Sequence, residues 1–187
     1  MKIGVLSIQG GFQKHLDILK KINISSVKVI YKEQLRNCSG LIIPGGESTT
    51  ISKLLVKYNL SESIKEFASE KPVLGTCAGL ILMSKNSNDK RVENLNLISI
   101  EVQRNGWGRQ VESFSQTLKI ENTEKNIEAV FIRAPKILRL GENVNVLARF
   151  ENEPVFIKEG IHYAACFHPE LTNDTTIHKI FTESIAA

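Results

Sequence analysis

The chain has 187 residues, of which 42% are hydrophobic and 24% charged, and its formal net charge is +4. A chain of this length buries enough apolar surface for one α/β domain, so we expect a single domain over residues 1–187. The scattered lysines and arginines argue against a nucleic-acid partner, and three cysteines at no repeated spacing argue against a disulfide framework or a zinc site.

No apolar run approaches the roughly 18 to 20 residues that a membrane-spanning helix needs. The run at residues 3–8 is too short for a signal peptide, is broken by Gly4 and Ser7, and is not followed by a small-residue cleavage site. We therefore expect a protein of the reducing cytoplasm without membrane contact. The sequence indicates no metal and no cofactor, and we expect neither.

The first half of the chain alternates short apolar runs with amphipathic stretches. An apolar run at 2–8 predicts a buried strand, and Phe12, Leu16 and Leu19 have the spacing of a helix over 12–22. Further strands are expected at 27–31, 40–43 and 72–75, and further helices at 49–58 and 61–68 and from 78 to 83. Continuous apolar strands between helices indicate a mainly parallel sheet with helices on both faces.

The second half is richer in strands. Strands are expected at 98–103, 116–121, 129–133, 144–150, 154–158 and 163–167, and a helix is expected at 177–185. We find no internal repeat, linker or low-complexity segment, which is consistent with one domain.

A cysteine between small residues follows the strand expected at 72–75. The segment Gly75-Thr76-Cys77-Ala78-Gly79 has the position and composition of a nucleophile elbow. Small neighbours are needed there because flanking Cβ atoms would collide with the sheet or the substrate. The following helix N-terminus favours a thiolate. Cys77 is therefore the candidate nucleophile, the alternative being a buried structural cysteine.

The candidate base and its orienting carboxylate lie in Phe167-His168-Pro169-Glu170. Residues two apart in an extended chain point to the same side, so His168 and Glu170 converge. A carboxylate on one imidazole nitrogen fixes the tautomer and leaves the other nitrogen to take the thiol proton. Alone this pattern is more often a surface pair; with Cys77 it predicts a Cys-His-Glu triad.

A glycine-rich turn occupies residues 44–50, with the sequence Pro-Gly-Gly-Glu-Ser-Thr-Thr. Such a turn at a helix start presents backbone N–H groups to an oxyanion or a carboxylate. A phosphate loop is rejected, because the lysine of the Walker pattern is absent. The same residues would also serve an ordinary capped helix start.

Together these three segments resemble those of the triad glutamine amidotransferases. Further motifs make the chain similar, from end to end and in order, to the glutaminase-subunit family of pyridoxal 5′-phosphate synthases. The motifs are Gly10, 44–50, 75–80, Val102-Gln103-Arg104-Asn105, Gly108-Arg109-Gln110, Phe131-Ile132-Arg133-Ala134-Pro135 and 167–172.

The resemblance implies a flavodoxin-like class I glutamine amidotransferase fold and L-glutamine as the substrate. It also implies a partner, the (β/α)₈-barrel synthase subunit, which receives ammonia and makes pyridoxal 5′-phosphate, the vitamin B6 cofactor. Carried over by position, the triad falls on Cys77, His168 and Glu170. The implied glutamine-binding positions are Gly46, Glu47, Ser48, Arg104, Ile132 and Arg133.

The residue chemistry and the resemblance agree on the reaction. The Cys77 thiolate attacks the side-chain amide carbon of glutamine, while the backbone N–H groups of Gly46 and Ala78 hold the oxyanion. His168 protonates the departing ammonia and then activates water to release glutamate from the thioester. Arg104 or Arg133 either binds the substrate α-carboxylate or lines the partner interface.

The chain departs from the family pattern at two places. Gly106-Trp107 stands where the family usually has Ser-Phe, which bears on how Arg104 is presented, and the stretch 84–97 is polar and differs from its relatives. Neither departure removes a catalytic group. The alternatives are a cysteine peptidase or related hydrolase, a non-catalytic scaffold, and a glutaminase that feeds another synthase, in the histidine or a nucleotide pathway.

Overall fold

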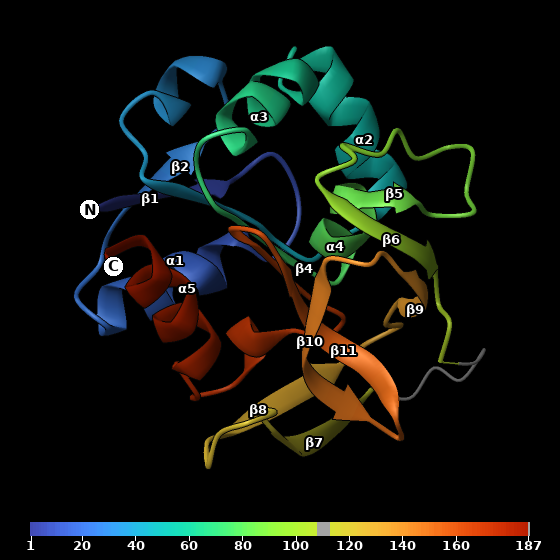
Figure 1. The fold of residues 1–187 in the computed structure, drawn as a ribbon. Coiled ribbons are helices and arrows are strands. Elements are labelled where there is room, and N and C mark those ends of the chain that lie inside the picture. The colour runs from blue at the N-terminus through green and yellow to red at the C-terminus, as the bar shows by residue number, and fades with distance from the viewer. Residues whose placement is uncertain (108–112, 187) are drawn as a thin grey trace.

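A seven-stranded sheet forms the centre of the computed structural model, which describes residues 1–107 and 113–186 (Figure 1). Five of the strands run parallel, and two antiparallel strands form one edge. In spatial order the strands are β10 (Val144–Phe150), β11 (Glu153–Glu159), β12 (His162–Ala165), β4 (Val73–Thr76), β3 (Gly40–Ile43), β1 (Lys2–Leu6) and β2 (Ser25–Val29). The predicted mainly parallel sheet is confirmed.

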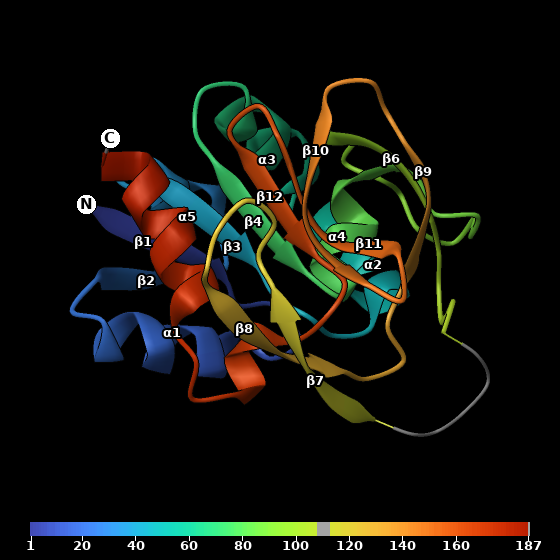
Figure 2. The same ribbon diagram turned by 60° about the horizontal axis from the view of Figure 1, so that its bottom comes forward.

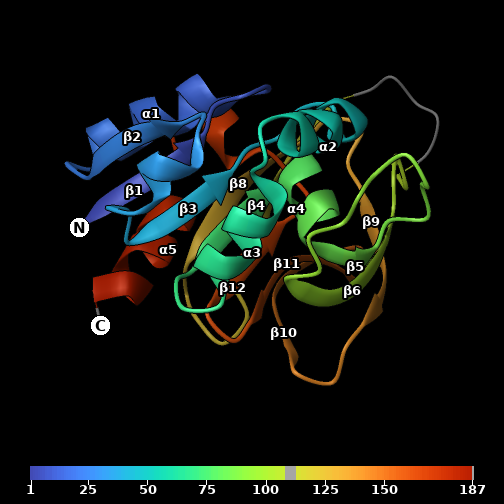
Figure 3. The same ribbon diagram turned by 90° about the horizontal axis from the view of Figure 1, so that it is seen from above.

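Helices cover both faces of this sheet, so its central strands are continuous apolar runs. Every residue of β3 and β4 is buried. On one face lie α1 (Phe12–Lys21) and α5 (Thr176–Ala186), and on the other lie α2 (Ser48–Lys57), α3 (Ser61–Ala68) and α4 (Ala78–Met83) (Figures 1 and 3). Two 3₁₀ turns, η1 (Lys32–Leu35) and η2 (Pro169–Leu171), complete the helical elements of the described residues.

Two small sheets stand beside the antiparallel edge (Figure 2). One contains β5 (Ser84–Asn86), β6 (Ile98–Gln103) and β9 (Lys136–Leu140), and the other contains β7 (Phe114–Lys119) and β8 (Asn126–Phe131). β9 contacts β11 and β7 contacts β10, so both small sheets are packed onto the central one.

Most expected elements are present, and the errors have physical reasons. β5 and β9 were not predicted, because β5 is a polar tripeptide and the exposed Arg139 interrupts the apolar run of β9. β2, β7 and β8 begin two or three residues before the predicted strands, since these early residues are mostly polar, which weakens the sequence pattern, but they pair through their backbones. Among the described residues, no helix is long and apolar enough to cross a membrane.

Candidate active site

The strand order brings the three predicted segments to one end of the sheet. β4 lies between β12 and β3, with Thr76 paired to Ala165 and Gly75 paired to Ile43. These strands are parallel, so the residues that follow them leave the sheet at the same edge. The cysteine, the His-Pro-Glu segment and the glycine-rich turn therefore meet there, although they are far apart in sequence.

Cys77 occupies the turn between β4 and α4 in a strained backbone conformation. Its φ of 48° and ψ of −102° lie in a region that non-glycine residues rarely adopt. Its N–H donates to the Ala165 carbonyl oxygen at 2.8 Å, which ties the turn to β12. A Cβ at Gly79 would lie 2.0 Å from the Ile43 carbonyl oxygen, so the helix start needs glycine to fit against β3. The sheet thus fixes the direction of the thiol.

His168 is held from both sides. The backbone N–H of His168 donates to the Val130 carbonyl oxygen of β8 at 2.8 Å, and the preceding Phe167 is fully buried. Its Nδ1 lies 2.7 Å from Glu170 Oε1, which fixes the tautomer and leaves the other ring nitrogen for the hydrogen bond to Cys77. Burial lowers the pKa of His168, but the hydrogen bonds to Cys77 and Glu170 outweigh burial and raise this pKa to about 10.

Glu170 is almost completely buried, with 4% of its surface exposed. Burial alone would raise the pKa of its carboxyl group, but the neighbouring His15 and His168 imidazoles hold this pKa below its ordinary value. The carboxylate is therefore ionised near neutral pH and faces a protonated His168. This charge distribution stabilises an imidazolium next to the Cys77 sulfur, which is what a thiolate nucleophile requires.

The glycine-rich turn packs directly against these groups. A Cβ at Gly45 would lie 2.3 Å from His168 Cε1, so a larger residue would displace the imidazole. The Gly45 carbonyl oxygen accepts from Gly11 N–H at 2.9 Å. Since a trans peptide has its C=O and N–H on opposite sides, Gly46 N–H points away from Gly11.

A pocket of about 390 Å³ opens over the sulfur. Its lining contains all three predicted triad residues and all six predicted glutamine-binding positions: Cys77, His168, Glu170, Gly46, Glu47, Ser48, Arg104, Ile132 and Arg133. Ala78, predicted to donate its backbone N–H, is buried next to Cys77 at the start of α4 and is not among the lining residues. The Ser48 hydroxyl is buried and, among the described residues, has no hydrogen-bond partner, so a polar ligand would satisfy it.

The rim of the pocket is held by charge pairs. Arg104 Nη2 lies 2.9 Å from Glu47 Oε1, and its Nη1 pairs with Asp89, which also binds Arg91 at 2.8 Å. Glu47 caps α2 by accepting from the backbone N–H groups of Thr49 and Thr50. Burial raises the pKa of Glu47, but the hydrogen bonds from Thr49 and Thr50 lower this pKa to about 2. Asp89 was not predicted, because it lies in the polar stretch 84–97.

The Gly106-Trp107 departure is accommodated by local packing. Trp107 donates its Nε1–H to the Pro135 carbonyl oxygen at 3.1 Å, and its ring packs against Phe131 and Phe150. Gly106 N–H donates to the Ala134 carbonyl oxygen at 3.1 Å. The tryptophan thus anchors the segment after Arg104 to the end of β8. The motif Gly108-Arg109-Gln110 lies outside the described residues.

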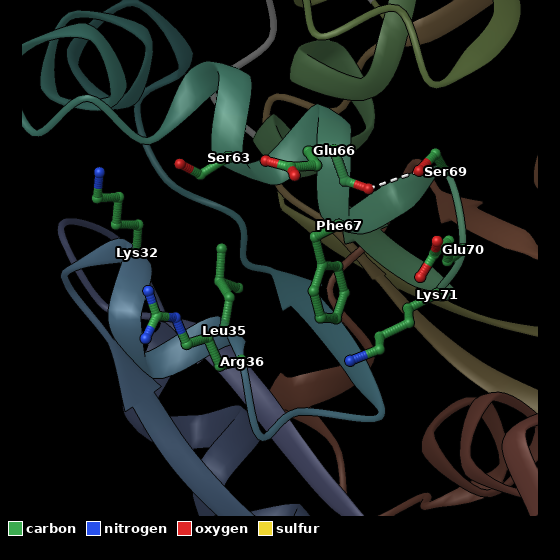
Figure 4. Close-up of a pocket in the computed structure, with 9 residues that line it drawn as sticks. All are labelled: Lys32, Leu35, Arg36, Ser63, Glu66, Phe67, Ser69, Glu70 and Lys71. Carbon is green, nitrogen blue, oxygen red and sulfur yellow. Dashed lines mark hydrogen bonds between the residues drawn. The ribbon is translucent and has the colours of Figure 1, made fainter.

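Another hollow, of about 420 Å³, lies between η1 and α3 (Figure 4). The described residues that line it include Lys32, Arg36, Glu66 and Lys71 but no cysteine or histidine. This hollow is slightly larger than the pocket over Cys77. Chemistry and not size therefore identifies the candidate active site.

Two buried histidines behind Glu170 were also not predicted. His15 of α1 and His178 of α5 are fully buried, and His15 Nε2 lies 3.4 Å from Glu170 Oε2. The signal in the sequence would have been a histidine on the buried face of each helix. For α1, the buried residues are His15, Ile18 and Leu19, whereas Phe12 and Leu16 are only partly buried.

Comparisons with known proteins agree with this geometry. The model of the SNO glutamine amidotransferase family matches residues 5–187. The chain belongs to this family. The glutamine amidotransferase is 46% identical over 186 residues to a protein of Brevibacillus brevis named "Pyridoxal 5'-phosphate synthase subunit PdxT", covering 99% of this chain and 97% of the relative.

A protein of Thermosipho africanus with the same name is 46% identical over 187 residues, covering 99% of each chain. A solved structure described as "Crystal structure of glutamine amidotransferase" is 40% identical, with a TM-score of 0.94 and coverage of 99% of both chains. The structure of PurLQS from Thermotoga maritima has a TM-score of 0.70 at 15% identity, covering 99% of this chain and 96% of that one, and shares the fold.

Proposed function

We propose that this glutamine amidotransferase hydrolyses L-glutamine to L-glutamate and ammonia with Cys77, His168 and Glu170 as its catalytic triad. One observation carries the proposal: a single imidazole, His168, is hydrogen-bonded to a buried carboxylate and lines the same pocket as the elbow cysteine. The family assignment supplies the reaction class.

In the first half-reaction the Cys77 thiolate attacks the side-chain amide carbon of glutamine and forms a tetrahedral intermediate. Backbone N–H groups of Gly46 and Ala78 stabilise its oxyanion. The imidazolium of His168 gives its proton to the amide nitrogen, ammonia leaves, and a glutamyl thioester remains. In the second half-reaction His168 takes a proton from water, the hydroxide attacks the thioester, and the Cys77 thiolate departs as glutamate is released.

Substrate recognition falls to the rim and to the start of α2. Ser48 offers a buried hydroxyl that has no hydrogen-bond partner in residues 1–107 and 113–186, and Glu47 offers a carboxylate that is ionised near neutral pH and suits the α-ammonium group of glutamine. Arg104 and Arg133 supply positive charge for the α-carboxylate. Arg133 is exposed and adopts a φ of 45°, a conformation that directs the chain after β8 along the pocket.

The ammonia supports pyridoxal 5′-phosphate synthesis by a separate synthase subunit, a (β/α)₈ barrel. The names of the relatives support this assignment, since this chain covers 97 to 99% of their length at 46% identity. Copurification of this chain with its partner tests it. Recovery of a synthase from the histidine or a nucleotide pathway would contradict the pathway while leaving the glutaminase chemistry intact.

Docking of the partner activates the glutaminase by fixing the Gly45–Gly46 peptide. In the free chain the Gly45 carbonyl is bonded to Gly11, and glycines at both positions make a peptide reorientation inexpensive. Loss of one oxyanion donor costs roughly 10²- to 10³-fold in rate. Glutamine hydrolysis should therefore rise with added synthase subunit. Equal turnover with and without the partner would contradict the gating and leave the triad untouched.

The decisive experiment compares Cys77→Ala with Cys38→Ala in an ammonia-release assay with the partner present. Both cysteines are buried, but Cys38 lies before β3 and far from the pocket. Cys77→Ala should abolish ammonia release without unfolding the chain, and Cys38→Ala should retain it. A glutamine-analogue electrophile should label Cys77 alone. Appreciable turnover by folded Cys77→Ala would overturn the assignment.

A further inference from the structure

Behind the triad, a row of buried polar side chains runs from Glu170 to α1 and α5, the two helices on one face of the sheet. Glu170 Oε1 is hydrogen-bonded to His168. Glu170 Oε2 has no hydrogen-bond partner among the described residues and faces His15 Nε2 at 3.4 Å. His15 Nδ1 in turn lies 2.9 Å from His178 Nε2. The side chains of His15 and Glu170 are 0% and 1% exposed, so water does not screen this contact.

The negative charge of the carboxylate favours one arrangement of hydrogens along this row. An ionised carboxylate only accepts, so the nitrogen that faces it, His15 Nε2, carries the hydrogen. Burial lowers the pKa of His15, so its ring is neutral and its Nδ1 is an acceptor. His178 must therefore donate from Nε2. The remaining nitrogen, His178 Nδ1, is then a bare lone pair, and it has no hydrogen-bond partner among the described residues.

His15 also connects the carboxylate to the glycine-rich turn. Its Nε2 lies 3.3 Å from Thr76 Oγ1, and Thr76 Oγ1 accepts from Gly45 N–H at 3.1 Å. Thr76 directly precedes Cys77, and Gly45 packs against the His168 ring. One imidazole thus contacts both the residue that orients the base and the residue that fixes the turn.

We propose that His15 is a positioning residue for the glutaminase reaction, with its Nε2–H facing the second oxygen of Glu170 in a buried electrostatic contact and with His178 fixing the tautomer that allows this. The inference rests on the proposed glutaminase function. It concerns alignment, because His15 is fully buried and is not among the residues that line the pocket. Its loss should therefore lower kcat and leave KM nearly unchanged.

Two substitutions of His15 separate its two nitrogens. The amide of His15→Gln can place an N–H where Nε2 stands, whereas the amide of His15→Asn reaches only the position of Nδ1. Loss of the N–H that faces the buried carboxylate predicts a fall in kcat of roughly 10- to 10²-fold for His15→Asn. His15→Gln should recover most of the activity. Equal kcat values for the folded Gln and Asn variants would overturn the proposal.

A double-variant cycle tests whether His15 acts through Glu170. In a Glu170→Gln background the His15→Asn change should cost less than about threefold in kcat, since its target is already removed. A full, additive loss in that background would show a general structural role and contradict the proposal. Thr182→Val is the matched control, because Thr182 is buried on α5 and bonds only to helix carbonyls. It should leave kcat unchanged.

A spectroscopic measurement needs no substitution. Nitrogen-15 NMR of histidine-labelled protein should show His15 as a neutral ring protonated at Nε2, and an Nδ1-protonated His15 would overturn the proposal.

The activity of the wild type distinguishes failure of the proposed glutaminase function from failure of the proposed role of His15. An inactive wild type with its partner would contradict the glutaminase function, whereas an active wild type with an equally active His15→Asn variant would contradict only the role of His15.

Discussion

The floor of the pocket and its rim are built in opposite ways. The floor, formed by Cys77, His168 and Glu170, is attached to the ends of adjacent strands, and Cys77 and Glu170 are only 6% and 4% exposed. The rim, formed by Glu47, Asp89, Arg104 and Arg133, comes from loops and an exposed helix start, and the side chains of Arg104 and Glu47 are 22% and 44% exposed.

This difference separates two tasks. Reacting atoms must be aligned within a fraction of an ångström, and a hydrogen-bonded sheet provides that alignment. Charge pairs on a partly exposed rim contribute little to stability because water screens them, so they exchange partners at small cost. We therefore expect substitutions in the floor to change kcat by orders of magnitude, and substitutions in the rim to change KM modestly.

The largest effects should come from the floor. His168→Asn should reduce kcat by roughly 10⁴-fold or more, because the imidazole transfers protons in both half-reactions. Glu170→Gln should retain roughly 10- to 10²-fold more activity than His168→Asn, since the carboxylate only orients and stabilises the ring. Single-turnover ammonia release measures both. A Glu170→Gln variant less active than His168→Asn would reverse the assigned roles.

The pH profile should respond to the same carboxylate. His168 has a pKa raised to about 10, so the alkaline limb of kcat/KM in the wild type should lie near that pH. Removing the negative charge in Glu170→Gln should move this limb down by roughly one to three pH units. Because the pKa of His168 is higher in the folded protein than its ordinary value of about 6.5, protonation of His168 also stabilises the fold. This stabilisation is complete below pH ~6.5 and is lost as the pH rises through about 10. An unmoved limb would contradict the coupling of the two groups.

At the rim, Arg104→Ala should raise KM by roughly 10- to 10²-fold and change kcat by less than about threefold, as expected for a lost charged hydrogen bond to substrate. Steady-state kinetics with glutamine, in the presence of the partner, provides the measurement. Unchanged KM combined with weaker partner binding would instead place Arg104 in the subunit interface.

The smallest effect should come from Asp89→Asn. Asp89 shares the Arg104 guanidinium with Glu47, so its neutralisation should leave more positive charge for the substrate carboxylate. KM should fall by at most about threefold, and the fall should be smaller at high salt. Glu62→Gln is the control, because Glu62 is exposed and pairs with Lys65 on α3. A rise in KM for Asp89→Asn would mean that Asp89 orients Arg104 for binding.

The sequence predicted the floor better than the rim. Cys77, His168 and Glu170 were brought together in the prediction because strand ends and small residues are local signals, and parallel strands meet at one edge of a sheet. The extended chain expected for 168–170 was wrong, since Pro169–Leu171 forms a 3₁₀ turn, but this turn also brings Glu170 to His168. The pairing of Arg104 with Asp89 was not predicted, because it joins a loop to a polar stretch that has no periodicity. Such contacts depend on the complete fold and leave no local pattern.

The buried face of α1 illustrates the same limit. Phe12, Leu16 and Leu19 predicted the helix correctly, but the structure buries His15, Ile18 and Leu19 most deeply. A histidine is not recognised as a core residue by hydrophobic periodicity. Its burial is favourable because residues distant in sequence, His178 and Thr76, supply hydrogen-bond partners.

The place of β12 in the sheet has a consequence for biosynthesis. This strand inserts between β4 and β11, and only then does His168 reach the cysteine. During translation Cys77 is made well before His168, and pairing across such a separation forms late in folding. A nascent or prematurely terminated chain that ends before His168 thus carries the Cys77 thiol without the proposed proton acceptor, and under the proposed mechanism it does not hydrolyse glutamine.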